Sequence, residues 1–389
     1  MIIKSILDAD LYKFTMQQAI IKLYPNIKVR YTFINRDKTI FPDGFAEELR
    51  KEVHKMENLM LLKDEKEWLL KNCHFLSPAY LDFLEGYRYD SSDIGIIQIN
   101  GDLQISIEGY WYKTVLWETT LMALISELYF KITNQKAISK EKRIENNNRK
   151  ANLFKLNGIS YADFGTRRRY SYDVHDELVH NFSEFSLNKE NFLGTSNVHF
   201  AHKYNIKAIG THAHEWFSFH AAAFGYKMAN KLALESWINV YNGDLGIALS
   251  DTFTSDVFFR DFDKKLSRTF DGLRQDSGDP IEFTIKAIKH YEKMGIDPKS
   301  KTIIFSDNLN VDTVLSIRNY CRGKINYSFG IGTHFTNDVG VKPLNMVIKL
   351  TQCKIDNLWI NTIKLSDVIG KHTGDEKEIE ICKHTLKII

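Results

Sequence analysis

The stretch Lys207-Ala-Ile-Gly-Thr-His-Ala-His-Glu-Trp-Phe217 decides the predicted fold. Its short apolar run ends at Gly210, is followed by Thr211, His212 and His214, and passes into a segment with the composition of a helix. Such a change of pattern is typical of a buried strand that leads through a loop into a helix. The stretch therefore predicts a strand end that carries chemically active side chains.

Six further segments repeat this pattern of a short apolar run before a helical stretch. The seven runs span residues 159–164, 192–198, 206–210, 245–250, 270–274, 302–306 and 325–331. Strands that alternate with helices pair in parallel, and about seven or eight such units favour a barrel over an open sheet. We predict an α/β fold with an irregular (β/α) barrel over residues 117–339.

The first 116 residues have a different, α+β pattern. Asp8 precedes an amphipathic run and is expected to cap a first helix. Alternating residues over 28–34 predict a strand that ends just before Arg36. Residues 43–88 have helical periodicity, and residues 94–112 have the β-branched composition of a hairpin. This part is predicted to be a separate N-terminal domain.

Composition limits the classes of partner. The chain of 389 residues has 52 Lys and Arg against 49 Asp and Glu, and its net charge of +3 argues against nucleic-acid binding. Its four cysteines are far apart, so neither a disulfide framework nor a structural zinc site is expected. No apolar run has membrane-spanning length, and the N-terminus does not resemble a secretory signal. We expect a cytoplasmic protein without a membrane partner.

Two strand ends of the predicted barrel suit anions. In Ser277-Gly278-Asp279-Pro280, the proline fits the first helical position and Asp279 the N-cap, so the Ser277 and Gly278 amides lie beside a positive helix end. A capped helix without a ligand explains these residues equally well. The turn Gly330-Ile-Gly332-Thr333 is a second and weaker candidate for a phosphate cradle.

Charged side chains occupy other strand ends. Arg167, the first of three successive arginines, and Arg274 can each hold a phosphate or a carboxylate through a bidentate guanidinium. At least one arginine of the run is expected to be structural. The acidic candidates are Asp251, Asp276, Asp279 and Asp307. Acidic groups near anion sites indicate Mg²⁺ with a polyphosphate, or stabilisation of a cationic transition state, although loop capping explains at least one of them.

His214 has three interpretations. With His212 it could bind a metal, as in barrel hydrolases with a His-x-His strand, but the later strand ends supply mainly Asp, Ser and Asn. It could instead be a hydrogen-bonded core histidine. The third interpretation is a nucleophile that accepts a phosphoryl group among phosphate-binding neighbours.

Nine motifs along the chain are similar to those of one family. They are Asp10-Leu-Tyr-Lys-Phe-Thr-Met-Gln, Phe33-Ile-Asn-Arg-Asp, Asp163-Phe-Gly-Thr-Arg-Arg, Phe192-Leu-Gly-Thr-Ser-Asn, Gly210-Thr-His-Ala-His-Glu-Trp, Gly272-Leu-Arg-Gln-Asp-Ser-Gly-Asp-Pro, Phe305-Ser-Asp-Asn-Leu, Phe329-Gly-Ile-Gly-Thr and Pro343-Leu-Asn-Met-Val-Ile-Lys-Leu. In this order they resemble nicotinate phosphoribosyltransferases. The resemblance implies that nicotinate and 5-phosphoribosyl 1-pyrophosphate give nicotinate mononucleotide and pyrophosphate, coupled to ATP hydrolysis in NAD salvage.

The resemblance also implies a role for each matching residue. His214 corresponds to the family's autophosphorylated histidine, and Asp251 and Asp276 to further catalytic positions. The set that matches nicotinate-binding residues is Tyr12, Phe164, Thr211 and Arg274. The set that matches residues for phosphate and phosphoribosyl pyrophosphate is Arg36, Arg167, Ser277, Gly278, Asp279, Asp307, Gly332 and Thr333.

Membership of this family would imply further properties. Mg²⁺ is the expected cofactor, with no ligand assigned, and ATP is the expected co-substrate. A homodimer with shared active sites is expected, in which Tyr12 serves the neighbouring subunit. The N-terminal domain of residues 1–116 would be completed by residues 340–389, so that the barrel is inserted in a discontinuous domain. The pattern of the C-terminal part fits, since residues 347–353 and 358–365 alternate around Asp356-Asn357 as a hairpin.

Two residues depart from the family pattern, and other functions stay open. His334 stands where bacterial members often have Arg, and His212 stands at a position that we regard as incidental. The nearest alternative is a nicotinamide phosphoribosyltransferase. A metal-dependent barrel hydrolase and a nicotinate-binding protein without catalytic activity are less favoured.

Overall fold

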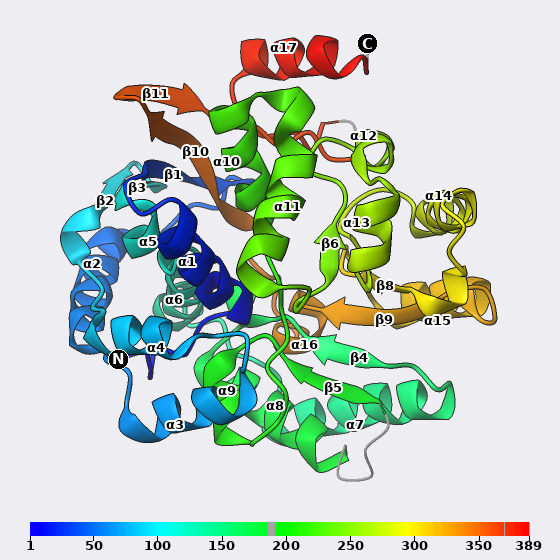
Figure 1. Ribbon diagram of the computed structural model, residues 1–389. Coiled ribbons are helices and arrows are strands. Elements are labelled where there is room, and N and C mark those ends of the chain that lie inside the picture. Colours follow the sequence, from blue (N-terminus) through cyan, green and yellow to red (C-terminus); the bar gives the residue numbers. More distant parts are fainter. Residues whose placement is uncertain (186–190, 369, 389) are drawn as a thin grey trace. The chain divides into compact units, whose positions relative to one another are not determined.

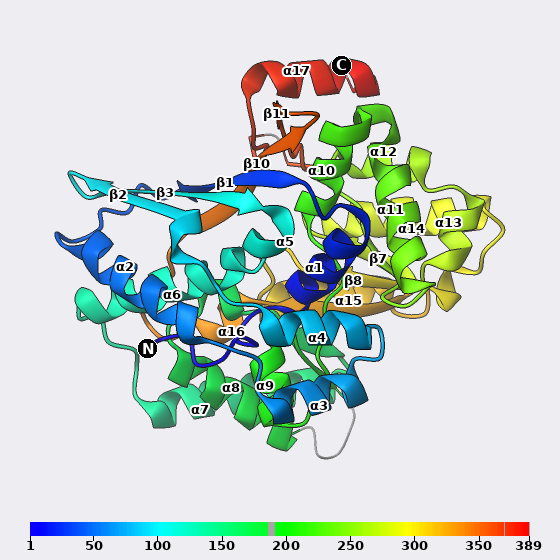
Figure 2. The same ribbon diagram turned by 60° about the vertical axis from the view of Figure 1, so that its left-hand side comes forward.

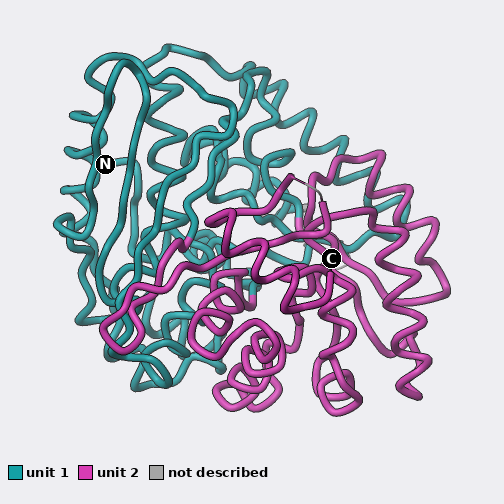
Figure 3. Tube along the Cα trace, turned by 90° about the horizontal axis from the view of Figure 1, so that it is seen from above, with its two compact units in different colours: residues 1–210, 331–349 teal, residues 211–330, 350–389 magenta. Residues whose placement is uncertain are grey.

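The structure of the chain is a computed structural model that describes residues 1–185, 191–368 and 370–388. The chain forms two compact units, coloured separately in Figure 3. Unit 1 comprises residues 1–210 and 331–349, and unit 2 comprises residues 211–330 and 350–389. The domain boundaries expected at residues 117 and 340 follow the sequence pattern rather than contacts in space, and they stay a prediction.

Three antiparallel strands of unit 1 form the N-terminal β-structure. Strand β1 (Lys28–Asn35) pairs with β3 (Asp102–Tyr110), which pairs with β2 (Ile94–Ile99). Helices α2 (Phe45–Lys55) and α6 (Trp117–Ile132) lie on one side of these strands, as Figure 2 shows. Successive β1 side chains alternate between buried and more exposed positions, as the period of two requires. The predicted strand and hairpin are therefore confirmed.

The first helix begins later than its predicted cap. Helix α1 (Leu11–Leu23) has Asp10 at the N-cap position, and Asp8 is fully buried and paired with Arg169. The expectation that Asp8 caps this helix is therefore wrong. Burying a carboxylate without a cation costs more free energy than leaving a helix without a side-chain cap, and Asp8 is paired with Arg169. The other helices of unit 1 are α3 (Lys63–Asn72), α4 (Pro78–Gly86), α5 (Trp111–Thr114), α7 (Lys140–Leu156), α8 (Tyr172–Phe185), α9 (Val198–Lys203) and α16 (Thr333–Thr336), with 3₁₀ turns η1 (Met56–Asn58), η2 (Ser91–Asp93) and η3 (Thr166–Arg168).

Unit 1 also holds the first two parallel strands, β4 (Tyr161–Asp163) and β5 (Phe192–Thr195). The strand expected at 206–210 is reduced to one bridge between Ala208 and Thr195. The chain then turns at Gly210, whose φ is 150° and where a Cβ would lie 3.1 Å from the Tyr12 amide nitrogen. A side chain at this position would therefore be crowded by helix α1.

Unit 2 contains four parallel strands. Each of β6 (Ile247–Leu249), β7 (Gly272–Gln275) and β8 (Thr302–Phe305) pairs with the next strand along the chain, up to β9 (Asn326–Ile331). The helices of this unit, labelled in Figure 1, are α10 (His214–Phe224), α11 (Ala229–Tyr241), α12 (Ser255–Asp261), α13 (Lys264–Thr269), α14 (Pro280–Lys293), α15 (Val311–Cys321) and α17 (Glu376–Leu386), with 3₁₀ turns η5 (Tyr226–Met228) and η6 (Pro298–Ser300). Because helices separate the parallel strands, the α/β class is confirmed. Closure into a barrel stays a prediction.

The predicted C-terminal hairpin is also present. Strand β10 (Met346–Ile355) begins in unit 1 and continues into unit 2, where it pairs in antiparallel register with β11 (Leu358–Asn361). The two-residue turn uses Asp356 and Asn357, which both have positive φ, as hairpin turns of this length require. Among the described helices, none is long and apolar enough to cross a membrane.

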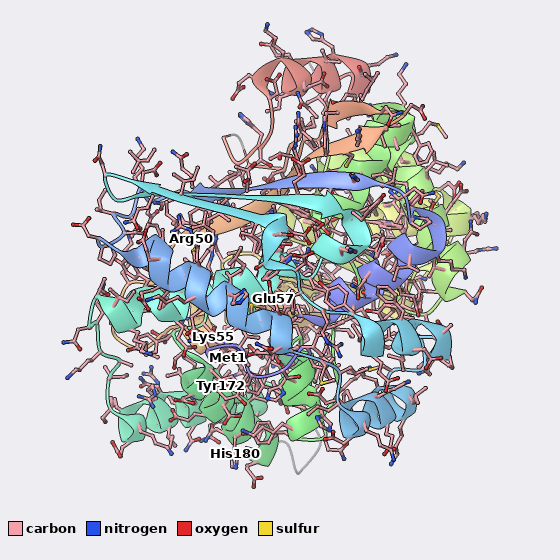
Figure 4. The ribbon with its side chains drawn as sticks, turned by 90° about the vertical axis from the view of Figure 1, so that its left-hand side faces the viewer. Met1, Arg50, Lys55, Glu57, Tyr172 and His180 are labelled. Carbon is pink, nitrogen blue, oxygen red and sulfur yellow. The ribbon has the colours of Figure 1, made fainter. Side chains whose placement is uncertain are left out.

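A buried ion pair joins the N-terminal segment to the loop after β4. Arg169 donates from Nη1 and Nη2 to the two carboxylate oxygens of Asp8 at 2.6 and 2.9 Å, and neither side chain is exposed. Burial raises the pKa of Asp8, but Arg169 lowers it below its usual value. The guanidinium lies 5.5 Å from the ring centre of Tyr172, a side chain of α8 that Figure 4 labels.

We expect Arg169→Met to destabilise unit 1 by about 3–5 kcal/mol, because the variant leaves the Asp8 carboxylate buried without its cation. Lys55→Met is the matched control. Lys55, labelled on α2 in Figure 4, pairs with Glu52 at 2.5 Å and is half exposed, so its loss should cost less than about 1 kcal/mol. Native-state hydrogen exchange of unit 1 amides measures both effects. Equal effects of the two substitutions would contradict the prediction.

Candidate functional site

The predicted site residues are divided between the two units. Unit 1 holds Tyr12, Arg36, Phe164, Arg167, Gly332 and Thr333. Unit 2 holds Thr211, His214, Asp251, Arg274, Asp276, Ser277, Gly278, Asp279 and Asp307. Each unit therefore holds its own set of groups: the charged residues of the unit 1 set are Arg36 and Arg167, and the unit 2 set includes His214 with acidic neighbours.

His214 is the centre of the set in unit 2. It is the first residue of α10, and its Nδ1 lies 2.9 Å from Thr252 Oγ1. Its Nε2 lies 3.0 Å from Asp276 Oδ2, 2.9 Å from Lys364 Nζ and 3.8 Å from Asp251 Oδ1. The three residues predicted to be catalytic are thus brought together, along with a lysine that the sequence did not point to.

Burial favours the neutral form of His214. Burial lowers the pKa of His214 to about 4, and the Lys364 ammonium acts in the same direction against Asp251 and Asp276. The imidazole is therefore uncharged near neutral pH, with a lone pair on one nitrogen. A buried neutral imidazole is a competent nucleophile.

Arg274 has the acidic partner that its strand-end position predicts. Its Nη2 donates to Asp276 Oδ1 at 2.9 Å, and its Nε donates to Ser306 Oγ at 2.9 Å. Ser306 Oγ donates in turn to Asp276 Oδ1 at 2.6 Å. Although burial favours the neutral carboxyl group, the Arg274 guanidinium holds the pKa of Asp276 well below its usual range. Arg274 Nη1 makes no hydrogen bond with any residue that the structure describes.

The segment after β11 completes this set. Leu365 N donates to Thr252 O at 2.8 Å, and Ser218 Oγ donates to Ile363 O at 2.9 Å. These two bonds fix the backbone on either side of Lys364. Sequence reasoning did not identify Lys364, because a lysine in a hairpin pattern carries no signal of its own, and its partners are far away in the sequence.

The Ser277-Gly278-Asp279 loop is built largely as a helix start. Asp279 Oδ1 accepts from the Ile281 and Glu282 amides at 2.8 Å each, which confirms the predicted cap of α14. Ser277 Oγ donates to Asp251 Oδ2 at 2.5 Å. The amides of Ile281 and Glu282 are thus satisfied by Asp279, and the anion role of the Ser277 and Gly278 amides stays a prediction.

Two further predicted residues of unit 2 lie near these strand ends. Thr211 Oγ1 donates to Ile247 O at 3.2 Å, so it is tied to the start of β6. Asp307, at the end of β8, lies 3.3 Å from Lys371 Nζ. Burial raises the pKa of Asp307, while Lys371 opposes that effect.

The three successive arginines of unit 1 have different environments. Arg169 is the buried partner of Asp8, and Arg168 donates to Met346 O from Nε and Nη2 at 3.0 and 2.7 Å. Arg167 is 39% exposed, and its Nη1 lies 3.7 Å from Glu118 Oε1. Burial and the charges of Arg167 and Arg36 lower the pKa of Arg168 to about 10. Two of the three arginines are thus structural, and Arg36 and Arg167 remain the candidates for anions.

A buried hydrogen-bond network positions the loop that carries Phe164. Asp163 accepts from the Gly165 amide at 2.9 Å, from Thr195 Oγ1 at 2.6 Å and from His175 Nε2 at 2.6 Å. Gly332 lies so close to this loop that a Cβ would be 3.1 Å from Phe164 O. Sequence reasoning assigned no role to Asp163 or His175, although Asp163 lies within a recognised motif.

The remaining histidines do not extend the site. His212 packs in the core with its ring centre 4.7 Å from that of Trp237, and its Nε2 accepts from Leu249 N at 3.3 Å. His334 Nε2 is buried without a hydrogen-bond partner among the described residues, and His334 O accepts from Lys150 Nζ. The described residues contain no group of three or more His, Cys, Asp or Glu arranged to hold a metal ion. The His-x-His metal interpretation therefore has no support from the geometry.

Comparison with known proteins gives one family throughout. The model of the nicotinate phosphoribosyltransferase (NAPRTase) family matches residues 159–388, and the model of the NAPRTase N-terminal domain matches residues 7–126. The nicotinate phosphoribosyltransferase of Chromohalobacter salexigens is 53% identical over 385 residues, covering 99% of this chain and 98% of the relative. That of Desulforapulum autotrophicum is 51% identical over 387 residues, covering 99% of both chains.

A solved structure gives the same result. The crystal structure of nicotinate phosphoribosyltransferase from Porphyromonas gingivalis has a TM-score of 0.96 and 46% identity, covering 99% of this chain and 100% of that one. The sequence motifs, the fold and the two family models agree over nearly the whole length. The chain therefore belongs to the nicotinate phosphoribosyltransferase family.

Proposed function

We propose that the chain converts nicotinate and 5-phosphoribosyl 1-pyrophosphate to nicotinate mononucleotide and pyrophosphate, coupled to ATP hydrolysis through phosphorylation of His214, in NAD salvage in the cytoplasm. The observation that carries the proposal is a buried neutral imidazole in contact with Asp276 and Lys364, in a chain of this family. A nucleophilic nitrogen without a proton is what phosphoryl transfer requires.

The residues proposed for the glycosyl transfer are those that the family resemblance implies. The pyridine nitrogen of nicotinate attacks C1 of the ribose, and the bond from C1 to the pyrophosphate oxygen breaks. Arg274 is proposed to hold the nicotinate carboxylate, with Thr211 nearby and Phe164 and Tyr12 against the ring. The transition state resembles an oxocarbenium ion, so the carboxylates Asp251 and Asp276 would stabilise its positive charge.

The phosphates and the ribose are assigned to the remaining predicted residues. Arg36 and Arg167 supply cations, and the amides of Ser277, Gly278, Gly332 and Thr333 supply hydrogen-bond donors. Asp307 is assigned to the ribose or to the base of a nucleotide. Asp279 is assigned to the helix start that the phosphate approaches, since its own carboxylate caps α14.

Mg²⁺ is proposed as the counter-ion of the polyphosphate substrates. The described residues do not form a ready-made metal site, but Mg²⁺ commonly combines substrate phosphate oxygens and water with few protein ligands. When bound, Mg²⁺ would neutralise the charge of the leaving pyrophosphate. A homodimer with Tyr12 serving the neighbouring subunit is proposed on the family resemblance alone.

The first test measures pyrophosphate release from phosphoribosyl pyrophosphate, with nicotinate or nicotinamide and with or without Mg-ATP. The native chain should prefer nicotinate, and Mg-ATP should raise its rate. In His214→Ala the stimulation by ATP should disappear, because no nitrogen is left to accept the phosphoryl group. Release with nicotinamide alone would assign the chain to that substrate, and no release with either base would refute transferase activity.

A second test concerns selectivity for the carboxylate of nicotinate. Arg274→Lys keeps the charge that Asp276 requires but lacks the planar fork that binds a carboxylate bidentately. We expect the KM for nicotinate to rise about 10- to 100-fold, as the loss of about 1.5–3 kcal/mol from a charged hydrogen bond implies. Arg268→Lys, at an exposed position on α13, is the matched control. An unchanged nicotinate KM in Arg274→Lys would remove Arg274 from the nicotinate set.

The pH dependence of phosphorylation follows from the low pKa of His214. With a pKa of about 4, the imidazole stays neutral as the pH falls from 8 to 5.5, so the initial rate of labelling by saturating Mg-ATP should stay nearly constant. An imidazole with the usual pKa of about 6.5 would be mostly protonated at pH 5.5, and the rate would fall about tenfold. A tenfold fall would show that His214 is charged in the acid range and contradict the prediction.

A further inference from the structure

Lys364 contacts a ring nitrogen of His214 rather than only a carboxylate. Its Nζ lies 2.9 Å from His214 Nε2 and 3.5 Å from Asp251 Oδ2, and its side chain is 14% exposed. An ammonium group donates hydrogen bonds and accepts none. The contact is therefore a hydrogen bond only if Nε2 carries the lone pair and the ring proton is on Nδ1.

The other side of the ring is compatible with this tautomer. His214 Nδ1 lies 2.9 Å from Thr252 Oγ1, a hydroxyl oxygen that can accept a hydrogen bond from the Nδ1 proton. Thr252 is buried, and its carbonyl oxygen accepts from Leu365 N, next to Lys364. Thr252 faces Nδ1 and Lys364 faces Nε2. The backbone hydrogen bond from Leu365 to Thr252 therefore connects the segments that carry these two residues.

Asp276 favours the opposite tautomer, with a proton on Nε2. Its Oδ2 lies 3.0 Å from that nitrogen and would favour a proton there. However, the Asp276 carboxylate is already bound at its other oxygen, where Oδ1 accepts from Arg274 and Ser306. Lys364 has only a weaker alternative among the described residues, because Asp251 Oδ2 is 3.5 Å away and already accepts from Ser277. We therefore take the contact of Lys364, and not that of Asp276, to set the tautomer.

We propose that Lys364 is a further catalytic residue, which holds His214 in the tautomer with a bare Nε2 and then binds the phosphoryl group that Nε2 accepts. This inference rests on the proposed phosphorylation of His214. In the step, the Nε2 lone pair forms a bond to the γ-phosphorus of ATP, the bond from that phosphorus to the β,γ-bridging oxygen breaks, and ADP leaves with the electron pair. The Nδ1 proton stays on the ring, facing Thr252.

The same step requires Lys364 to change partner. Once the lone pair of Nε2 forms the N–P bond, it can no longer accept from Lys364 Nζ. The new phosphoryl oxygens are then the nearest acceptors, and an ammonium beside them offsets the repulsion from Asp251 and Asp276. Lys364 thereby keeps Nε2 without a proton before the step and stabilises the phosphorylated histidine after it.

A measurement on the unmodified chain tests the tautomer without ATP. Nitrogen-15 NMR of the full chain distinguishes a protonated from a bare ring nitrogen, and His214→Gln identifies the signals of His214. We expect a neutral ring with the proton on Nδ1 at pH 7.5. A proton on Nε2 would overturn the proposal.

Lysine variants test the phosphoryl step. With γ-labelled ATP, Lys364→Met should lower the rate of label incorporation at His214 by about 100-fold or more, the loss seen when one preorganised donor is removed. Lys364→Arg should restore part of the rate, because it returns a cation. Lys377→Met removes an exposed lysine of α17 and should leave the rate unchanged. Phosphorus-31 NMR of the labelled native chain should show the Nε2 phosphoramidate.

The outcomes separate this inference from the proposed function. Absence of His214-dependent label in the native chain would refute the ATP coupling, while the tautomer measurement would still decide the Lys364 hydrogen bond. Native-like labelling of a folded Lys364→Met variant, or a phosphoramidate on Nδ1, would overturn the role of Lys364. If Lys364→Met fails to fold, the rate of Lys364→Arg and the tautomer in the native chain decide.

Discussion

The chemistry of unit 2 depends on a neutral imidazole buried among charges of both signs. Two cations, Lys364 and Arg274, are matched by two anions, Asp251 and Asp276, and His214 lies in contact with three of these four groups. Burial alone favours the uncharged ring, and the balanced charges do not reverse that preference. A ring that is neutral without losing its hydrogen bonds keeps a defined lone pair. That is the property on which a phosphoryl acceptor depends.

The fold explains how four separate segments supply these groups. Asp251 and Asp276 follow β6 and β7, which are parallel neighbours, so their carboxyl ends meet at one edge of the sheet. His214 begins α10, and Lys364 follows β11 on a segment fixed by backbone hydrogen bonds to either side. Parallel pairing thus brings Asp251 and Asp276 close together, and the C-terminal segment adds Lys364.

The sequence predicted what depends on local pattern. The Pro280 start and Asp279 cap of α14, the hairpin at 347–365 and most of the parallel strands have local signals in composition and spacing, and the structure contains them. The pairs Asp8–Arg169 and Lys364–His214 join residues 161 and 150 positions apart, and no local signal specifies such partners. The run at 206–210, predicted as a strand, forms one bridge, between Ala208 and Thr195.

The arginine run shows how one composition can serve two purposes. Arg168 and Arg169 bind a backbone carbonyl and Asp8, so they stabilise the loop, whereas Arg167 is partly exposed and lies 3.7 Å from Glu118. The charges of Arg167 and Arg36 lower the pKa of Arg168, which means that these three cations repel one another. An anion bound to Arg36 and Arg167 would relieve that repulsion. If these arginines hold the substrate phosphates as proposed, relief of this repulsion would supply part of the binding free energy.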